Sequence, residues 1–281
     1  MTLRLGIIGH GFVGKATDSG FQKNVKKFIV DPVYDTTVKD LENFLPDFIF
    51  ICVPTPMKKN GELDSSIIEE VFENIEKSSL KDIPLIVKST ILPDKLNALF
   101  IKNNKLVYNP EFLREKTADE DFINSKFVIL GGEKKICKMV KKIYEENSLC
   151  KTNKYFLTDI ESASIIKYSI NSFLATKVIF FNQMKDIFNS TNSLENWDDL
   201  TSVISLDERI GSSHMMVPGH DGKLGFGGAC FPKDVSALIT YSKKINKDFS
   251  LLDEVKKINN EIRNEYDSLS EREIEQNISF D

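Results

Sequence analysis

Short apolar runs alternate with helical patterns through the first half of the chain. The apolar runs predict β-strands at residues 3–8, 27–30, 48–53, 85–88, 105–108 and 127–131. Between them, the apolar spacing of a helix occurs at residues 13–22, 65–79 and 133–147. Strands that are separated by helices and apolar along their whole length are typical of a parallel sheet covered by helices. The first half is therefore predicted to be an α/β domain with a doubly wound parallel sheet.

The pattern changes near residue 158. Residues 159–189 form one long helical pattern that contains neither Gly nor Pro. After it come a second predicted helix at 194–204, a loop rich in Gly, Ser and His at 211–228, and a pattern of two helices at 232–276. We therefore expect an α/β domain at 1–158 and an all-helical domain at 159–281.

Composition limits the classes of function. A chain of 281 residues with 41% hydrophobic and 28% charged residues is ordinary for a soluble protein of about two domains. The net charge of −5 does not favour a nucleic-acid or anionic-membrane partner, and no apolar run has the length of a membrane span. The chain also enters its first predicted strand directly, without a signal peptide. We expect a soluble, cytoplasmic protein.

The four cysteines, at positions 52, 137, 150 and 230, are far apart and form no CxxC pair. They also have no His-rich sequence near them. This spacing argues against a disulfide framework and a zinc site, and it favours a reducing compartment. No metal is expected.

A GxGxxG motif directly follows the first predicted strand and opens a predicted helix. Gly9 allows the tight turn, Gly11 lets the backbone approach a pyrophosphate, and Gly14 permits close helix–strand packing. Asp31 ends the second strand, where a carboxylate accepts the ribose hydroxyls and repels a 2′-phosphate, so NAD is favoured over NADP. A glycine-rich turn without a ligand is the alternative, but strand, glycines, helix and acidic residue are all in register. The expected NAD contacts are Gly9, Gly11, Phe12, Val13, Gly14 and Asp31, and the expected domain is of the Rossmann type.

Three further motifs follow the third, fourth and fifth predicted strands. They are Val53-Pro54-Thr55-Pro56, Lys88-Ser89-Thr90 and Asn109-Pro110-Glu111-Phe112-Leu113-Arg114-Glu115. In an open α/β sheet, the carboxyl ends of the strands line the ligand crevice. These motifs are therefore candidates for binding and chemistry.

Lys167 and Asn171 lie four residues apart on the long predicted helix, so their side chains project from one face. Leu174 and Val178 on that face are apolar. A lysine beside a buried stripe can hold an alkoxide or an oxyanion. From the spacing alone, a snorkelling lysine beside a surface asparagine is the stronger alternative.

Cys230 follows a glycine-rich loop and stands just before Pro232, a residue suited to the first turn of the next helix. A thiol at a helix N-terminus beside Lys233 is placed to be a good nucleophile. The alternative is a small buried cysteine, which is the favoured interpretation for Cys52 inside its apolar strand.

These sequence motifs, taken together, resemble those of the UDP-glucose/GDP-mannose dehydrogenase family. The resemblance covers nearly all of the chain, through GxGxxG, VPTP, NPEFLRE, Lys-x3-Asn and GFGGACFPKD in the family's order. The last motif is highly specific, and its form is most like that of the UDP-glucose members, although GDP-mannose members share much of it. The resemblance implies a two-fold, four-electron oxidation that consumes two NAD and converts UDP-glucose to UDP-glucuronate.

The resemblance also implies roles for individual residues. Cys230 would be the nucleophile of the second oxidation, and Lys167, Asn171 and Asp234 would hold and deprotonate the sugar oxygen through a water. Glu115 would be the acid/base of thioester hydrolysis, and Thr90 would place the water. The remaining NAD contacts would be Val53, Pro54, Thr55, Thr90, Glu115 and Lys233. The nucleotide sugar would contact Glu111, Phe112, Leu113, Arg114, Lys167, Asn171, Phe226, Gly227 and Cys230, together with Arg209 from a neighbouring subunit.

The chemistry of a four-electron oxidation agrees with these roles. The aldehyde formed by the first oxidation has no suitable hydride to give until a nucleophile adds to it. A thiolate forms a thiohemiacetal, and the thiohemiacetal collapses to a thioester as the second hydride leaves. Lys167 and Asn171 can stabilise the oxyanion formed on the way.

The family's long central helix builds a dimer, so a homodimer is expected here. Family members usually continue into a third, C-terminal α/β domain that closes over the nucleotide, whereas this chain stops at Asp281. The loop at 212–223, with His214, His220 and Asp221, either covers part of that gap or is an ordinary mobile loop, the favoured alternative. Two other functions stay open: a two-electron dehydrogenase that does not need Cys230, and a catalytically impaired NAD- or sugar-nucleotide-binding remnant.

Overall fold

The computed structural model describes residues 2–280 and divides them into two compact units. The first unit contains residues 2–55 and 64–167, and the second contains residues 56–63 and 168–280. The boundary lies inside one helix, α7 (Ile160–Asn189), so this helix contributes to both units. The functional division at residue 158 stays a prediction.

The first unit is built on a sheet in which, within the described residues, seven strands are joined in the order β2-β1-β3-β4-β5-β6-β7. The strands are β1 (Leu3–Ile8), β2 (Val25–Val30), β3 (Phe48–Ile51), β4 (Leu85–Val87), β5 (Leu106–Tyr108), β6 (Val128–Gly132) and β7 (Tyr155–Thr158). All neighbours are parallel except β5 and β6, which pair antiparallel. The predicted Rossmann-type α/β fold is confirmed. Two of the described strands, β6 and β7, run opposite to the other five. This reversal was not predicted, because an apolar run carries no information about strand direction.

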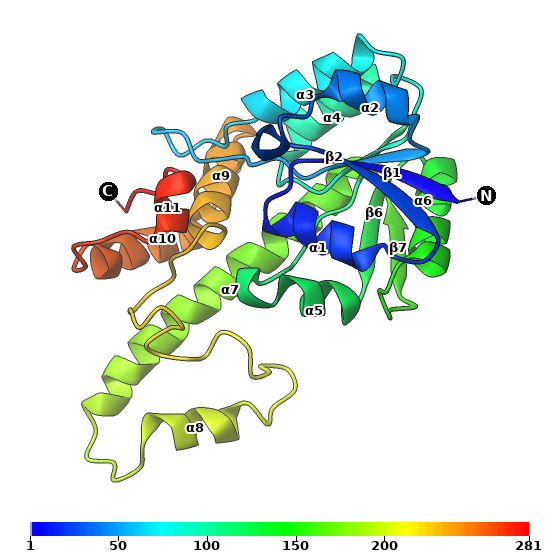
Figure 1. The fold of residues 1–281 in the computed structure, drawn as a ribbon. Helices are drawn as coiled ribbons and strands as arrows, with labels where there is room; N and C mark the ends of the chain where they lie inside the picture. The colour runs from blue at the N-terminus through cyan, green and yellow to red at the C-terminus, as the bar shows by residue number, and fades with distance from the viewer. Residues whose placement is uncertain (1, 281) are drawn as a thin grey trace. The chain divides into compact units, whose positions relative to one another are not determined.

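Helices cover both faces of this sheet (Figure 1). They are α1 (Phe12–Gly20), α2 (Val38–Phe44), α3 (Ser66–Glu76), α4 (Pro93–Lys102), α5 (Ala118–Ile123) and α6 (Lys134–Asn147), with 3-10 turns η1 (Pro32–Tyr34) and η2 (Glu115–Thr117). Successive side chains of β3 point to opposite faces of the sheet, and each face has its own hydrophobic core. Ile49 and Ile51 pack with α2, α3 and α4, whereas Phe48 and Phe50 pack with α1, α5 and α6. Each such side chain contributes about 1.5–3 kcal/mol of burial free energy, so the two cores hold the strand ends rigidly.

The second unit is helical. Its elements are the remainder of α7, α8 (Trp197–Ile204), α9 (Phe231–Lys244), α10 (Ser250–Arg263) and α11 (Glu271–Glu275). The prediction of two helices after residue 232 was wrong, because the described residues form three. α11 is only five residues long, which is too short for an apolar period to show. A capping box between Ser270 and Glu273 begins it.

The residues after α11 fold back onto the second unit. Ile278 and Phe280 are buried and cluster with Met57, and the Met57 N–H donates to the carbonyl of Gln276 at 2.9 Å. Residues 56–63 are thereby tied to the C-terminal segment.

α7 is the longest helix, with 30 residues. Lysines interrupt its apolar residues at positions 167, 177 and 185. In residues 2–280, no helix combines the length and the apolar character that crossing a membrane requires.

Candidate functional site

The glycine-rich turn of the first unit connects β1 to α1. A side chain at position 14 would begin 2.1 Å from the carbonyl oxygen of Gly9, so only glycine lets the helix approach the turn this closely. A side chain at Gly11 would meet no atom within 4 Å. Gly11 therefore faces open space beside the N–H groups of the first turn of α1, as a pyrophosphate site requires.

Asp31 directly follows β2 and holds the same turn. Its carboxylate accepts the N–H of His10 at 2.6 Å through Oδ2 and the N–H of Val33 at 3.0 Å through Oδ1. These two bonds fix the orientation of the carboxylate. A carboxylate has about four lone-pair sites, so capacity remains for the hydroxyls of a ribose.

The motif after β3 and the motif after β4 are joined by a hydrogen bond. The hydroxyl of Ser89 donates to the carbonyl of Val53 at 2.7 Å. Thr55 and Thr90 are both buried, whereas Pro54 is exposed. The two predicted cofactor motifs therefore lie at one edge of the sheet.

Lys88 joins the motif after β4 to the motif after β5. Its ammonium donates to Oδ1 of Asn109 at 3.1 Å, and the hydroxyl of Tyr144 donates to the same oxygen at 2.6 Å. The Asn109 amide donates in turn to the carbonyl of Ile129. Burial lowers the pKa of Lys88. This buried polar cluster fixes the start of the 109–115 segment.

Lys167 lies against that segment. Its ammonium donates to the carbonyl of Glu111 at 2.5 Å, lies 3.5 Å from the Glu111 carboxylate, and sits 5.0 Å from the centre of the Phe112 ring. Glu111 also accepts the N–H of Leu113 at 2.6 Å. Lys167 is only 3% exposed, so the snorkelling alternative is wrong and the lysine is a positioned buried cation.

Arg114 and Glu115 follow at the start of η2. The Arg114 guanidinium makes two hydrogen bonds to the Asp121 carboxylate, at 3.0 and 2.7 Å. This pairing raises the pKa of Arg114 and lowers the pKa of Asp121, outweighing the burial of Asp121, which raises it. Arg114 is therefore directed at α5, and Glu115 is exposed.

Cys230 is the N-cap residue of α9, and Pro232 occupies the first turn. The Cys230 carbonyl accepts the N–H of Asp234 at 2.9 Å, which begins the helix. The thiol is partly exposed. The predicted position at a helix N-terminus is thus present in the structure.

A buried polar cluster lies one turn into α9. Asp234 is 0% exposed and accepts the amide of Asn171 and the ammonium of Lys233, each at 2.6 Å. A carboxylate buried this completely is stable only with such partners. Asn171, Lys233 and Asp234, three predicted site residues, are therefore brought together by the fold, and Asn171 is not a surface residue.

The loop before Cys230 is held by residues that the sequence did not identify. Asn182 accepts the N–H of Gly225 at 3.0 Å, and Asn259 accepts the N–H of Phe226 at 2.6 Å and returns a bond to the Phe226 carbonyl. Glu273 accepts the N–H of Gly228 at 2.9 Å. Signals for these residues are weak, since a lone Asn or Glu in a helix is usually a surface residue.

The segment that carries Arg209 is anchored from α7. The Lys177 ammonium donates to the carbonyls of Ile210 and Gly211, each at 2.9 Å, and its burial lowers the pKa of Lys177. Arg209 itself is exposed and makes two hydrogen bonds to Asp207.

The loop at 212–223 is also anchored. Met215 and Val217 are buried in a cluster with Phe181 and Trp197. Asp221 pairs with Arg263 at 2.7 Å. The loop is therefore packed against its own unit.

The other three cysteines have raised thiol pKa values. Burial raises the pKa of Cys52 to about 12 and that of Cys137 to about 11, and it also raises the pKa of Cys150. Cys52 is 8% exposed, which confirms its interpretation as a small buried residue.

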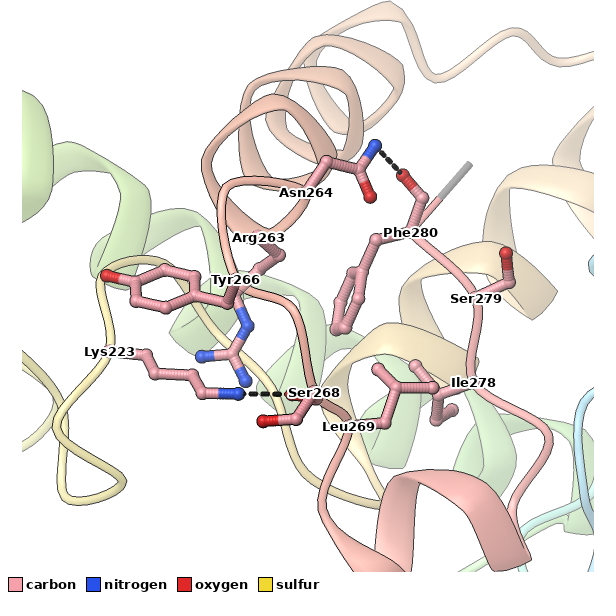
Figure 2. A pocket seen from close by; sticks show the side chains of 9 residues that line it. All are labelled: Lys223, Arg263, Asn264, Tyr266, Ser268, Leu269, Ile278, Ser279 and Phe280. Carbon is pink, nitrogen blue, oxygen red and sulfur yellow. Dashed lines mark hydrogen bonds between the residues drawn. The ribbon is translucent and has the colours of Figure 1, made fainter.

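The second unit contains a cavity of about 260 Å³, drawn in Figure 2. Its lining is Lys223, Arg263, Asn264, Tyr266, Ser268, Leu269, Ile278, Ser279 and Phe280. Lys223 donates to the Ser268 carbonyl, and Asn264 donates to the Phe280 carbonyl. These polar groups support the wall, and none of the predicted site residues lines the cavity.

Comparisons with known proteins match both parts of the chain. Residues 36–148 match the model of the UDP-glucose/GDP-mannose dehydrogenase family, NAD binding domain, and residues 161–261 match that family's central domain. The UDP-glucose 6-dehydrogenase of Rickettsia felis is 34% identical over 218 residues, which cover 75% of this chain and 47% of the relative. The chain thus spans about half the length of the curated relatives it matches. These matches confirm the resemblance expected from the motifs.

Solved structures give the same result for the fold. A UDP-glucose dehydrogenase from Pyrobaculum islandicum superposes with a TM-score of 0.73 at 22% identity, covering 92% of this chain and 68% of the other. A GDP-mannose dehydrogenase from Pseudomonas aeruginosa superposes with a TM-score of 0.63 at 25% identity, covering 93% and 69%. Proteins named for different nucleotides share this fold, so the fold does not select the nucleotide.

Proposed function

Because the chain belongs to the UDP-glucose/GDP-mannose dehydrogenase family, we propose that it oxidises UDP-glucose to UDP-glucuronate with NAD. The observation that carries this proposal is the buried cluster that Asn171 of α7 forms with Lys233 and Asp234, which lie in the first turn of the helix that Cys230 caps. A simple alcohol dehydrogenation needs no nucleophile, whereas a four-electron oxidation does.

The residues of the first unit fit NAD. Gly11 offers an open backbone edge at the N-terminus of α1, and the Asp31 carboxylate is oriented by two backbone N–H groups. A carboxylate at this place accepts ribose hydroxyls and repels a 2′-phosphate. When bound, NAD supplies the acceptor for the hydride in each of the two oxidations.

Lys167 and Asn171 act on the sugar oxygen in the first oxidation. Asp234 holds one N–H of the Asn171 amide, and the second N–H of such an amide can donate to the substrate oxygen. Lys167 is held by the Glu111 carbonyl, and its ammonium stabilises the alkoxide as the hydroxyl proton leaves through a water held by Asp234. The alcohol loses a proton and a hydride and becomes an aldehyde.

Cys230 carries the second oxidation. Its thiolate forms a C–S bond to the aldehyde carbon, and the carbonyl electrons move onto oxygen to form a thiohemiacetal oxyanion. Loss of the hydride from the same carbon gives a thioester. Water then adds to the thioester carbon, the C–S bond breaks, and the thiolate returns as the acid leaves. Glu115 takes the proton of that water, and Thr90 places the water.

The same family membership supports a homodimer through α7. Phe173, Phe180 and Ile187 are spaced by seven residues, so they lie along one side of the helix. Their exposed fractions are 67%, 56% and 60%. A row of exposed large apolar side chains is typical of a contact surface.

The deciding experiment counts NADH formed per acid produced when the chain is incubated with NAD and UDP-glucose, with GDP-mannose in parallel. Two NADH per acid with UDP-glucose supports the proposal. With Cys230→Ser, NADH should form only to the aldehyde stage, and acid should be almost absent. One NADH per oxidised product and unchanged turnover of Cys230→Ser would indicate a two-electron dehydrogenase. Tight NAD binding without NADH from any nucleotide sugar would indicate a binding protein.

A further inference from the structure

Glu273 lies at a contact between the C-terminal segment and the loop that precedes Cys230. It is 1% exposed and belongs to the short helix α11. One carboxylate oxygen accepts the N–H of Gly228 at 2.9 Å, and the other accepts the N–H of Ser270 at 2.7 Å. Burial raises the pKa of Glu273, but the hydrogen bonds from Ser270 and Gly228 outweigh burial and lower it. Glu273 therefore joins α11 to the loop as a carboxylate.

A glycine at position 227 lets the loop backbone approach the Glu273 carboxylate closely. A side chain at position 227 would begin 2.0 Å from Nη2 of Arg263 and 2.4 Å from Oε1 of Glu273. Only a glycine allows the ion pair to press against the backbone in this way. At the other end of the loop, Asn259 holds both backbone polar groups of Phe226. Cys230 follows the second anchor, Gly228, by two residues.

Arg263 completes the attachment. Its guanidinium donates to Glu273 at 2.9 Å and to Asp221 at 2.7 Å while it is 3% exposed. Figure 2 shows it flanked by the rings of Tyr266 and Phe280, which lie 5.9 and 5.3 Å away. Packing on two sides and two carboxylates leave the guanidinium little freedom, so Glu273 is held rigidly.

We propose that Glu273 is a positioning residue for Cys230, acting through the peptide N–H of Gly228. This inference rests on the proposed function, because it assigns Glu273 to the thioester-forming step. Gly228 is two residues before the nucleophile, and a glycine loop has no side chains of its own to hold its shape. A displacement of about 1 Å is enough to lower the rate of a covalent step strongly. The carboxylate supplies the restraint that the loop lacks.

The structural part of the proposal is tested by backbone hydrogen exchange of the peptide that covers Gly225–Phe231, followed by mass spectrometry. Glu273→Ala should speed exchange in this peptide roughly tenfold or more, because a charged hydrogen bond is lost. Glu273→Gln keeps an acceptor and should have a smaller effect, and it serves if the alanine variant does not fold. Glu271→Ala, on the exposed side of the same helix, is the matched control and should leave exchange unchanged. Unchanged exchange in both Glu273 variants would overturn the proposal.

The catalytic part is tested by the ratio of NADH to acid with UDP-glucose. In Glu273→Ala, aldehyde should escape before it is captured, so the ratio should rise above two while acid formation falls roughly 10- to 100-fold. The KM for NAD should not change, and Glu273→Gln should recover part of the acid. A purely structural defect would reduce both oxidations together and keep the ratio at two, which would overturn the proposal.

The hydrogen-exchange experiment and the NADH-to-acid ratio together distinguish a failure of this inference from a failure of the proposed function. If the unaltered chain forms no NADH from any nucleotide sugar, the proposed function fails and so does the catalytic part of the inference. The hydrogen-exchange experiment still decides whether Glu273 holds the loop. If the unaltered chain forms two NADH per acid and Glu273→Ala does the same at an unchanged rate, the proposed function stands and the inference fails.

Discussion

Asp234→Asn tests the buried cluster beneath Cys230. The substitution keeps the size of the side chain but removes the charge that faces Lys233, whose side chain is 7% exposed and lies 2.6 Å away. Breaking a buried ion pair on one side typically costs about 3–5 kcal/mol, because it leaves the partner charge buried without compensation. The amide can still accept one hydrogen bond, so we expect a loss near the lower figure. With a urea m-value of about 1–2 kcal/mol/M, the unfolding midpoint should fall by roughly 1.5–3 M.

The assay is urea unfolding followed by tryptophan fluorescence. The chain has a single tryptophan, Trp197, and it is 6% exposed within the second unit, so its emission reports on that unit. Asp253→Asn is the matched control. Its partner Lys243 is also on α9, at 2.8 Å, but the two side chains are 39% and 54% exposed. A pair this exposed contributes less than about 1 kcal/mol.

The two substitutions should therefore differ by about 2 kcal/mol or more. Lys233→Met combined with Asp234→Leu removes both charges and should recover much of the loss. Equal urea midpoints for Asp234→Asn and Asp253→Asn would show that breaking the Lys233–Asp234 pair costs no more stability than breaking an exposed pair. That result would refute the reasoning. Turnover of the same variants, measured where all remain folded, should fall for Asp234→Asn and for the double variant, because both lose the Asp234 carboxylate, and should stay unchanged for Asp253→Asn.

Four further outcomes are expected. Iodoacetamide at about pH 8 should label Cys230 well before Cys52, because burial raises the pKa of Cys52 to about 12; peptide mapping over time checks the order, and equal rates would contradict it. Asp31→Ala should weaken NAD binding roughly 10- to 100-fold in calorimetry, and a change below about two-fold would remove Asp31 from the cofactor site. Phe180→Glu should convert a dimer to a monomer in sedimentation experiments, and a monomeric unaltered chain would refute the dimer itself. Glu273 has a folded pKa below its ordinary value of 4.5, so its stabilising effect is present above about pH 4.5 and is lost as the pH falls through the folded pKa. The difference in stability from Glu273→Gln should shrink over that range, and a constant difference would show that the carboxylate is not responsible.

The fold could be predicted where a single element is long or fully buried. The helix expected at 159–189 is observed as Ile160–Asn189, because its apolar residues have helical spacing and no Gly or Pro interrupts them. β3 was found from its apolar run. β7 was missed because its apolar run, Tyr155-Phe156-Leu157, has only three residues and lies between polar segments, which is too short to indicate a strand. α2 was also missed, although its capping box of Thr37 and Asp40 is a recognisable start signal.

The chemical groups of the site were easier to predict than the groups that support them. Cys230, Lys233 and Asp234 belong to one motif whose residue types indicate their chemistry. Lys167 was ambiguous, because helical spacing does not distinguish a surface lysine from a buried one. Its burial against Glu111 depends on a segment more than fifty residues away in the sequence, which no local pattern encodes.

The loop before Cys230 explains why a motif identifies chemistry without specifying geometry. Glycines let this loop pass close to Arg263 and Glu273, but they contribute no side chains that would hold its backbone in one conformation. The restraint must therefore come from outside the motif, and in this chain it comes from Asn259 and Glu273, which lie beyond the motif in the sequence. The C-terminal segment thus contributes a buried carboxylate that binds the backbone of this loop. It follows that transferring a catalytic motif between proteins transfers its reactive groups, while the precision of those groups depends on buried partners that each chain must supply elsewhere.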